Sequence, residues 1–203
     1  MIFMINKKDK NKYKTLTQKQ LNEVFISSCE KGHLEIVKYL LTSPDLKEHA
    51  DIHADNDYGF RLACARGQLE VVKYLLTSPN LKEHADIHAD NGFRLACANG
   101  QLEIVKYLLT GTDLKEHANI NANNDSGFRL ACSRGHLEVV KFLLTGTDLK
   151  EHADIHADND FGFRLACANG QLEIVKFLIL DMSIEKTKYI EDYLNEKQNK
   201  LKI

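Results

Sequence analysis

The chain has 203 residues, of which 43% are apolar, and a formal charge of −2 at pH 7. This apolar content is enough to bury a core, which excludes disorder for most of the chain, and two prolines with no tryptophan favour helices over an all-β sandwich. No stretch approaches the roughly 20 apolar residues that span a bilayer, and the opening MIFMI is too short for a secretory signal, so we expect a soluble, intracellular protein with no membrane partner.

Charge is distributed unevenly along the chain. Residues 1–20 carry six lysines and one aspartate, residues 181–203 carry five charges of each sign, and the body between them is therefore about 7 negative. Because nucleic acids and anionic lipids attract positive surfaces, we expect neither to bind this body. We interpret residues 1–16 as a basic N-terminal arm, either solvated or weakly anchored to an acidic surface.

The next feature along the chain is an internal repeat, which residues 17–182 carry about five times. The string GFRLAC occurs four times, with its phenylalanines at spacings of 33, 35 and 35 residues, and a weaker copy lies 35 residues upstream. A period of this length indicates one small unit stacked several times. All five cysteines share one place in the unit, so they count the repeats and indicate a reducing compartment rather than disulfides. They are Cys29, Cys64, Cys97, Cys132 and Cys167.

Each unit has the pattern of two helices. In the second copy FRLACARG predicts a short first helix, and Gly67 follows as a residue suited to a left-handed helix end. QLEVVKYLL then places Leu69, Val72 and Leu75 at helical spacing, which predicts a second, amphipathic helix. Neither helix can keep its apolar face dry alone, so stability should accumulate as units stack, at roughly 1.5–3 kcal/mol per buried aliphatic side chain.

The two ends of the repeated region differ from its middle. TQKQ, which begins at Thr17, predicts a capping box. Ser27 and Ser28 replace the Leu and Ala of later copies, which should leave a more polar face where no neighbour covers the first unit. In the C-terminal segment 183–203, an apolar stripe predicts a capping helix over residues 183–198. The stripe consists of Tyr189, Ile190, Tyr193 and Leu194.

The run GHLEIVKYLL, which begins at Gly32, together with LACANG and the period near 33, resembles the ankyrin repeat. The resemblance covers about residues 17–180. It implies a mainly α fold, an ankyrin-type helix-turn-helix solenoid with short β-hairpin-like fingers, in a single curved array. One departure is an inserted loop of the TSPDLKEH type after the second helix, with a trimmed hairpin before the next.

A second departure is that the family's helix-opening Thr-Pro-Leu-His is absent. Asparagine or serine precedes two of the GFR strings and can cap a helix. An aromatic residue precedes the other two and cannot, so we predict that the aspartate one residue earlier caps those helices. The four positions are Asn91, Ser126, Tyr58 and Phe161, and the two aspartates are Asp57 and Asp160.

The resemblance implies a non-enzymatic protein-protein interaction module that binds a protein partner through its concave face and finger tips. Arrays this regular resemble those of intracellular bacteria and large viruses, which implies a host protein as the target. Positions that vary between copies are the candidate contacts, since stacking already accounts for those that repeat, and exposed aromatics and arginines are typical of interface hot spots. The candidates are Tyr58, Asn91, Ser126 and Phe161 at the finger tips, and Arg66, Asn99, Arg134 and Asn169 at the ends of the first helices.

A structural role for the helix-end arginines stays open at this point, because a cation at a helix C-terminus is favourable by itself. Two further alternatives also stay open. The array is a passive spacer, or a fragment of a larger scaffold, if its units have no dedicated partner. We expect the chain to be a monomer.

The motif KEHADIHAD, which begins at Lys47, Lys82 and Lys150, places two histidines four residues apart with an aspartate between them, a composition typical of metal ligands. If the segment is extended, the two imidazoles of one copy lie on the order of 13 Å apart, too far to bind one zinc ion. The third copy also has Asn121 in place of its second histidine. We expect hydrogen bonds within and between fingers, with no metal or cofactor, and retain a metal-binding protein as an alternative function.

Catalysis is not indicated by the remaining residues. The cysteines lie among alanine and leucine, where a small buried side chain is expected, and a ladder of identical positions offers no unique base. His33 and His136 alternate with glutamine in other copies, which suits a hydrogen bond at a helix start. A ladder of arginines is interpreted as structural ion pairs with nearby aspartates, with a clamp for an acidic ligand as the alternative. It consists of Arg61, Arg94, Arg129 and Arg164.

Overall fold

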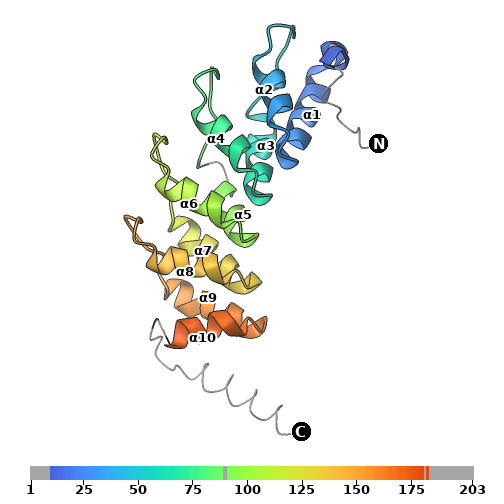
Figure 1. Cartoon of the computed structure of the whole chain (residues 1–203). Helices are drawn as coiled ribbons and strands as arrows, with labels where there is room; N and C mark the ends of the chain where they lie inside the picture. Colours follow the sequence, from blue (N-terminus) through green and yellow to red (C-terminus); the bar gives the residue numbers. More distant parts are fainter. Residues whose placement is uncertain (1–9, 89–90, 181, 183–203) are drawn as a thin grey trace. The chain divides into compact units, whose positions relative to one another are not determined.

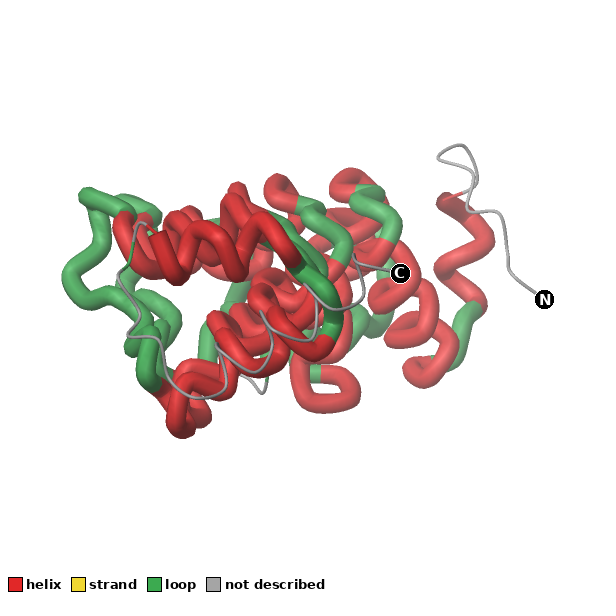
Figure 2. The backbone as a smooth tube through the Cα atoms, turned by 90° about the horizontal axis from the view of Figure 1, so that it is seen from below, coloured by secondary structure: helices red, strands yellow, loops and turns green. Residues whose placement is uncertain are grey.

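A computed structural model of the chain describes residues 10–88, 91–180 and 182. These residues form ten α-helices, one short 3-10 helix and connecting loops, without a strand (Figures 1 and 2). The expectation of a mainly α fold is confirmed. None of the described helices is both long enough and apolar enough to cross a membrane.

The helices come in pairs, one pair for each copy of the repeat. A 3-10 helix, η1 (Lys10–Thr15), precedes the first pair, α1 (Gln18–Glu30) and α2 (Leu34–Thr42). The next pairs are α3 (Ala54–Ala65) with α4 (Leu69–Thr77), α5 (Gly92–Ala98) with α6 (Leu102–Thr110), α7 (Ala122–Arg134) with α8 (Leu137–Thr145), and α9 (Ala157–Ala168) with α10 (Leu172–Leu180). The predicted two-helix unit is therefore present in all five copies.

The chain divides into two compact units. The first comprises Met1–Ala96 with Gln101–Asn119, and the second comprises Cys97–Gly100 with Ile120–Ile203. In the first unit α1 packs on α2 and α3, α3 packs on α4, and α4 contacts α2 and α6. In the second unit α7 packs on α8 and α9, and α10 packs on both α9 and α8. Within each unit, first helices stack on first helices and second helices on second helices.

The repeated apolar positions form the core of each unit. Phe60 in the middle of α3 and Cys64 near its end are fully buried, as are Val72 and Leu75 of α4. Their counterparts in the other repeats are buried to a similar degree, except that Cys167 is only half-buried. Because each such side chain contributes roughly 1.5–3 kcal/mol when removed from water, the contacts between pairs dominate the stability.

The expected β-hairpin-like fingers are not confirmed, since the described residues contain no strand, and a left-handed turn precedes three of the first helices. Three consecutive residues at the start of α3, α7 and α9 have φ between 52° and 57°, and the right-handed helix begins only after them. Among residues with a Cβ, asparagine and aspartate adopt this conformation most readily. The turn redirects the chain within three residues, so no strand pair forms there. The turns are Asp55, Asn56 and Asp57; Asn123, Asn124 and Asp125; and Asp158, Asn159 and Asp160.

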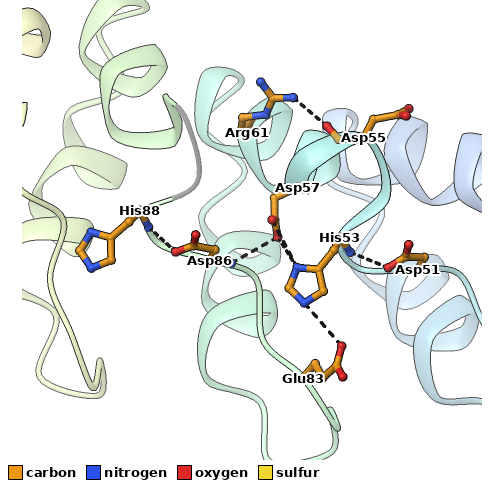
Figure 3. Close-up of polar contacts among 8 residues, drawn as sticks. All are labelled: Asp51, His53, Asp55, Asp57, Arg61, Glu83, Asp86 and His88. Atoms are coloured by element: carbon orange, nitrogen blue, oxygen red, sulfur yellow. Dashed lines mark hydrogen bonds and ion pairs between the residues drawn. The ribbon is translucent and has the colours of Figure 1, made fainter. Parts of the chain in front are cut away.

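The prediction that Asp57 and Asp160 cap the following helices is wrong. No side-chain cap hydrogen bond is present at the start of α3 or α9. The Asp57 carboxylate instead accepts the backbone N–H of Asp86, in the next repeat, at 3.2 Å. The left-handed turn places this carboxylate between two repeats, where the next segment of backbone has an amide to satisfy (Figure 3).

At the start of the array the predicted capping box is confirmed. Thr17 Oγ1 accepts the backbone N–H of Gln20 at 3.4 Å, and Gln20 Oε1 accepts the N–H of Thr17 at 3.0 Å. The expectation that the two serines of α1 leave an uncovered polar face is wrong for Ser28, which is fully buried. Its hydroxyl donates to the carbonyl of Val24 at 2.7 Å, so its polarity is satisfied within the helix.

Before α1, the structure describes the short helix η1. Tyr13 of η1 is 7% exposed, and its ring centroid lies 5.8 Å from that of Tyr39 on α2. The lysine-rich segment before the first repeat therefore contacts that repeat through the ring of Tyr13. The predicted capping helix over 183–198 lies outside the described residues and stays a prediction.

Adjacent repeats are also joined by a polar contact beside the glycine that ends the first helix of the earlier repeat. Gly135 has φ 83°, and a Cβ built there would lie 2.4 Å from Oε1 of Gln171. Gln171 belongs to the next repeat, and its Nε2 donates to the carbonyl of Ser133 at 3.2 Å. The glycine is therefore required twice, once by its backbone conformation and once by the side chain that passes over it.

Replacement of Gly135 by alanine should lower the free energy of unfolding more than replacement of Gly170 does. Both glycines have positive φ, but no described atom lies within 4 Å of a Cβ at Gly170. Each alanine should cost roughly 1–2 kcal/mol for the left-handed conformation, and Gly135→Ala should cost about 1 kcal/mol more by displacing Gln171. Urea denaturation measures the difference, and equal losses would contradict this account of the contact.

Candidate functional site

The candidate residues at the ends of the first helices are exposed, and the contacts of Arg66, Arg134 and Asn169 reach the preceding repeat. Arg66 donates through Nε and Nη2 to Oε1 of Glu30, at 3.2 and 2.9 Å. Arg134 Nη1 donates to the carbonyl of Ala98 at 3.0 Å. Asn169 Nδ2 lies 3.1 Å from the carbonyl of Ser133 and 2.9 Å from its hydroxyl. The fourth candidate, Asn99, is also exposed.

These contacts give the helix-end position a structural requirement, which is a side chain with a hydrogen-bond donor. Arginine and asparagine both meet it, and both occur there. The side chains nevertheless keep much of their surface in water, 62% of it in Arg66. The position can therefore hold the repeats together and still present polar groups to a partner.

The four candidates expected at finger tips differ in exposure. Tyr58 is 41% exposed, and its ring faces the guanidinium of Arg61, with Cζ 5.1 Å from the ring centroid. Phe161 is half-buried, because its ring lies 5.5 Å from Cζ of Arg129 and 5.0 Å from Cζ of Arg164. The Phe161 ring thus joins two repeats by two cation-π contacts.

The remaining two finger-tip candidates are half-buried and bonded close by. The Ser126 hydroxyl donates to the carbonyl of Ala122 at 3.3 Å, and the side-chain oxygen of Asn91 accepts from Nε of Arg94. Of the finger-tip set, Tyr58 alone is classed as exposed among the described residues.

The arginine ladder binds mainly backbone carbonyls, not the aspartate carboxylates that the sequence suggested. Arg61 Nη2 donates to the carbonyl of Asp55 at 2.9 Å. Arg129 and Arg164 make the same contact to the first residue of their turns, at 3.0 and 3.1 Å. One ion pair accompanies them, between Arg129 Nη1 and Asp158 Oδ2 at 2.7 Å. Each of these guanidinium groups thus donates a hydrogen bond to the carbonyl that opens its left-handed turn.

The comparison with known families agrees with this architecture. Residues 93–189 match a family model described as ankyrin repeats, in three copies. Residues 93–189 therefore belong to the ankyrin repeat family. No curated protein gives a significant match. Ankyrin repeats are generally protein-protein interaction modules and are generally not enzymes.

The first histidine of each KEHA segment closes the inserted loop. His49 Nε2 lies 2.9 Å from the carbonyl of Ser43, six residues earlier. Since a carbonyl only accepts hydrogen bonds, this nitrogen carries the proton. The other repeats repeat the contact at 3.0 or 3.1 Å, through His84, His117 and His152. The prediction of hydrogen bonds for these histidines is confirmed.

The second histidine of the motif faces carboxylates. His53 Nδ1 lies 3.1 Å from Asp57, and its Nε2 lies 3.5 Å from Glu83 of the next repeat (Figure 3). His156 Nδ1 lies 2.7 Å from Asp160. Each of these clusters is short of a metal site, since the described part of the chain contains no group of three or more His, Cys, Asp or Glu that is placed to hold a metal ion.

His136 forms its hydrogen bond across the repeat boundary and not within its own helix. Its Nε2 donates to the carbonyl of Ala98 at 3.0 Å. Gln68 makes the equivalent bond to the carbonyl of Glu30 at 3.1 Å. Histidine and glutamine are interchangeable here because each places a donor at the same distance from its backbone. The alternation of histidine and glutamine in the sequence predicted a hydrogen bond at this position, but it did not identify the acceptor.

Burial makes the cysteines poor nucleophiles. It raises the pKa of Cys167 to about 11, and raises the pKa of the other four thiols further still. The fraction of thiolate at neutral pH is therefore very small at each cysteine. This agrees with their interpretation as small buried side chains.

A thiol reagent applied to the folded chain should modify Cys167 first. Cys167 is half-buried, whereas Cys29, Cys64, Cys97 and Cys132 are buried. We expect one slowly reacting thiol per chain under native conditions and all five after denaturation, measured by mass spectrometry with a maleimide. Cys167→Ala should remove the native reaction, and fast labelling of any other cysteine in the folded chain would contradict the burial pattern.

Stability should fall in alkali because of the buried thiols. A raised pKa keeps a thiol protonated in the folded chain while the unfolded chain releases the proton, so the stabilisation is complete below about pH 8.5 and declines as pH rises further. Each fully buried thiol should remove roughly 1.4 kcal/mol per pH unit. Urea titrations between about pH 9 and about pH 11 should give Cys64→Ala a shallower decline than the parent, and parallel declines would contradict this assignment.

Proposed function

We propose that the chain is a non-enzymatic binding module that holds a protein partner against the exposed ends of its first helices. The observation that supports this most is the combination of exposure and variation at one structural position. The side chains at this position are exposed and differ between repeats, whereas most other side chains of the helix pairs are the same in each repeat. They belong to Arg66, Asn99, Arg134 and Asn169. In the first unit, exposed Tyr58 lies on α3, the helix that Arg66 follows, and adds an aromatic anchor.

The stacked helix pairs support binding because they limit the conformational freedom of these side chains before a partner binds. Arg66 and Arg134 are held by hydrogen bonds to the preceding repeat, so less side-chain freedom remains to be lost on association. The burial of the thiols and the use of the histidines in inter-residue contacts leave the helix ends as the best supported site. A host protein as the partner and a monomeric state remain parts of this proposal.

The proposal is tested by affinity capture from a host-cell lysate with quantitative mass spectrometry. In the first unit, Tyr58→Ala with Arg66→Ala should reduce recovery of a specific partner at least tenfold, the loss of about 1.4 kcal/mol expected when one hot-spot contact is removed. Lys38→Ala with Lys73→Ala, on the second helices of the same unit, should leave recovery unchanged and serves as the control.

Equal recovery by the helix-end variant and the parent would contradict the proposed surface. A capture profile with no partner above background would instead favour the passive spacer. Circular dichroism of each variant must match the parent, since Arg66 also bonds to Glu30.

A further inference from the structure

The last repeat has an apolar face that no described residue covers. Leu172 at the start of α10 is 51% exposed, whereas the leucines at its position in the four earlier repeats are half-buried. Cys167 of α9 is half-buried, whereas its four counterparts are buried. Each earlier repeat is followed by another helix pair, and the described residues contain none after α10. Leu172 and Cys167 therefore mark the face on which a following element would pack.

Leu180 at the end of α10 extends this face, and it stands where the other repeats have a polar residue. The other four second helices end on threonine, whose hydroxyl donates to a carbonyl of its own helix at 2.8 or 2.9 Å. Thr42 lines a cleft with residues 80–83 of the next repeat, so this position borders the repeat that follows. In the last repeat the leucine is 74% exposed. A large apolar side chain in place of a satisfied hydroxyl is unfavourable in water and becomes favourable under a cover.

The opposite end of the array is already covered by a flanking segment. Lys38 and Lys73 lie over the tyrosine rings of the repeats that follow them, with Nζ 5.9 and 5.6 Å from the ring centroids. No repeat precedes Tyr39, the equivalent ring of the first repeat. Tyr13 of η1 packs on it instead, and Tyr39 is only 8% exposed. The chain thus completes the interface at its first repeat with residues from outside the repeats.

We propose that residues 183–203 cover the apolar face of the last repeat, with their apolar stripe packed against Leu172 and Leu180. This segment lies outside the described residues, and it follows α10 almost directly, so the short connection keeps its effective concentration at the face high. It contains no further copy of GFRLAC, so it is not a sixth repeat of the same kind. Its stripe, which includes Ile190 and Tyr193, supplies the side chains that an apolar face needs for burial.

The consequence is an array that is closed at both ends by its own flanking segments. An open apolar end accepts a further helix pair, and chains that join end to end through such a face form filaments. A covered end prevents this and favours the monomeric state. The contact requires no partner protein, so it stands independently of the proposed binding function.

The test is a double-mutant cycle in the full chain, with Leu180→Thr and Ile190→Ser, followed by urea denaturation. Each single substitution should raise the unfolding equilibrium constant about tenfold, as expected when one large aliphatic side chain loses its cover. The combined effect should be smaller than the product of the two single effects, because both substitutions remove the same contact. Leu180→Thr restores the residue that ends the other second helices, so this variant is expected to fold.

Cys167 provides a second readout. Its reaction with a maleimide should become faster in both single variants, while Cys132, buried in the same compact unit, should stay unreactive. This difference separates local uncovering of the face from global unfolding. Glu191→Ser is the matched control, since it changes a residue of the same segment outside the stripe, and it should alter neither the stability nor the labelling.

Three outcomes would overturn the proposal. Independent or absent effects of the two substitutions on stability would show that Ile190 does not pack against Leu180. Unchanged labelling of Cys167 in both variants would show that this segment does not cover the face. A dimer in analytical ultracentrifugation that depends on concentration and is abolished by Leu180→Thr would assign the face to a second copy of the chain.

Discussion

The contact between one helix pair and the next is the constraint on which the rest of this structure depends. A pair as short as α3 with α4 cannot bury its apolar faces alone, so it is stable only against its neighbours. Phe60, Cys64 and Leu75 are fully buried for this reason, and the same residue types return in each copy because the same interface returns. The repetition of the sequence is thus a consequence of the repetition of one interface.

Stacking also determines what the polar residues do. At each boundary between repeats, backbone groups that no helix satisfies are met by side chains from the adjacent copy. Gln171 reaches the carbonyl of Ser133, and Asp57 accepts the amide of Asp86. Because these bonds lie between repeats, each one adds to the coupling of neighbouring pairs. Polar residues that resemble catalytic or metal-binding groups in the sequence are used here to complete an interface.

This use of polar residues limits where a partner can bind. Phe161 is held between two guanidinium groups, and the arginine ladder satisfies turn carbonyls. The ends of the first helices are still accessible. There, arginine and asparagine form hydrogen bonds to the preceding repeat with one part of the side chain and expose another part to water.

The sequence by itself determined the repeat, the two helices in each copy, the buried cysteines, and the capping box at Thr17, because these follow from periodicity and local propensity. It did not determine the left-handed Asp-Asn-Asp turn, the burial of Ser28, or the acceptors of Arg61, Gln68 and His53. Each of these depends on atoms about 30 or more residues away, or on a backbone conformation that composition alone leaves open. Only the tertiary structure decided them, because a hydrogen bond is directional and its partner is fixed by where the next repeat places its backbone.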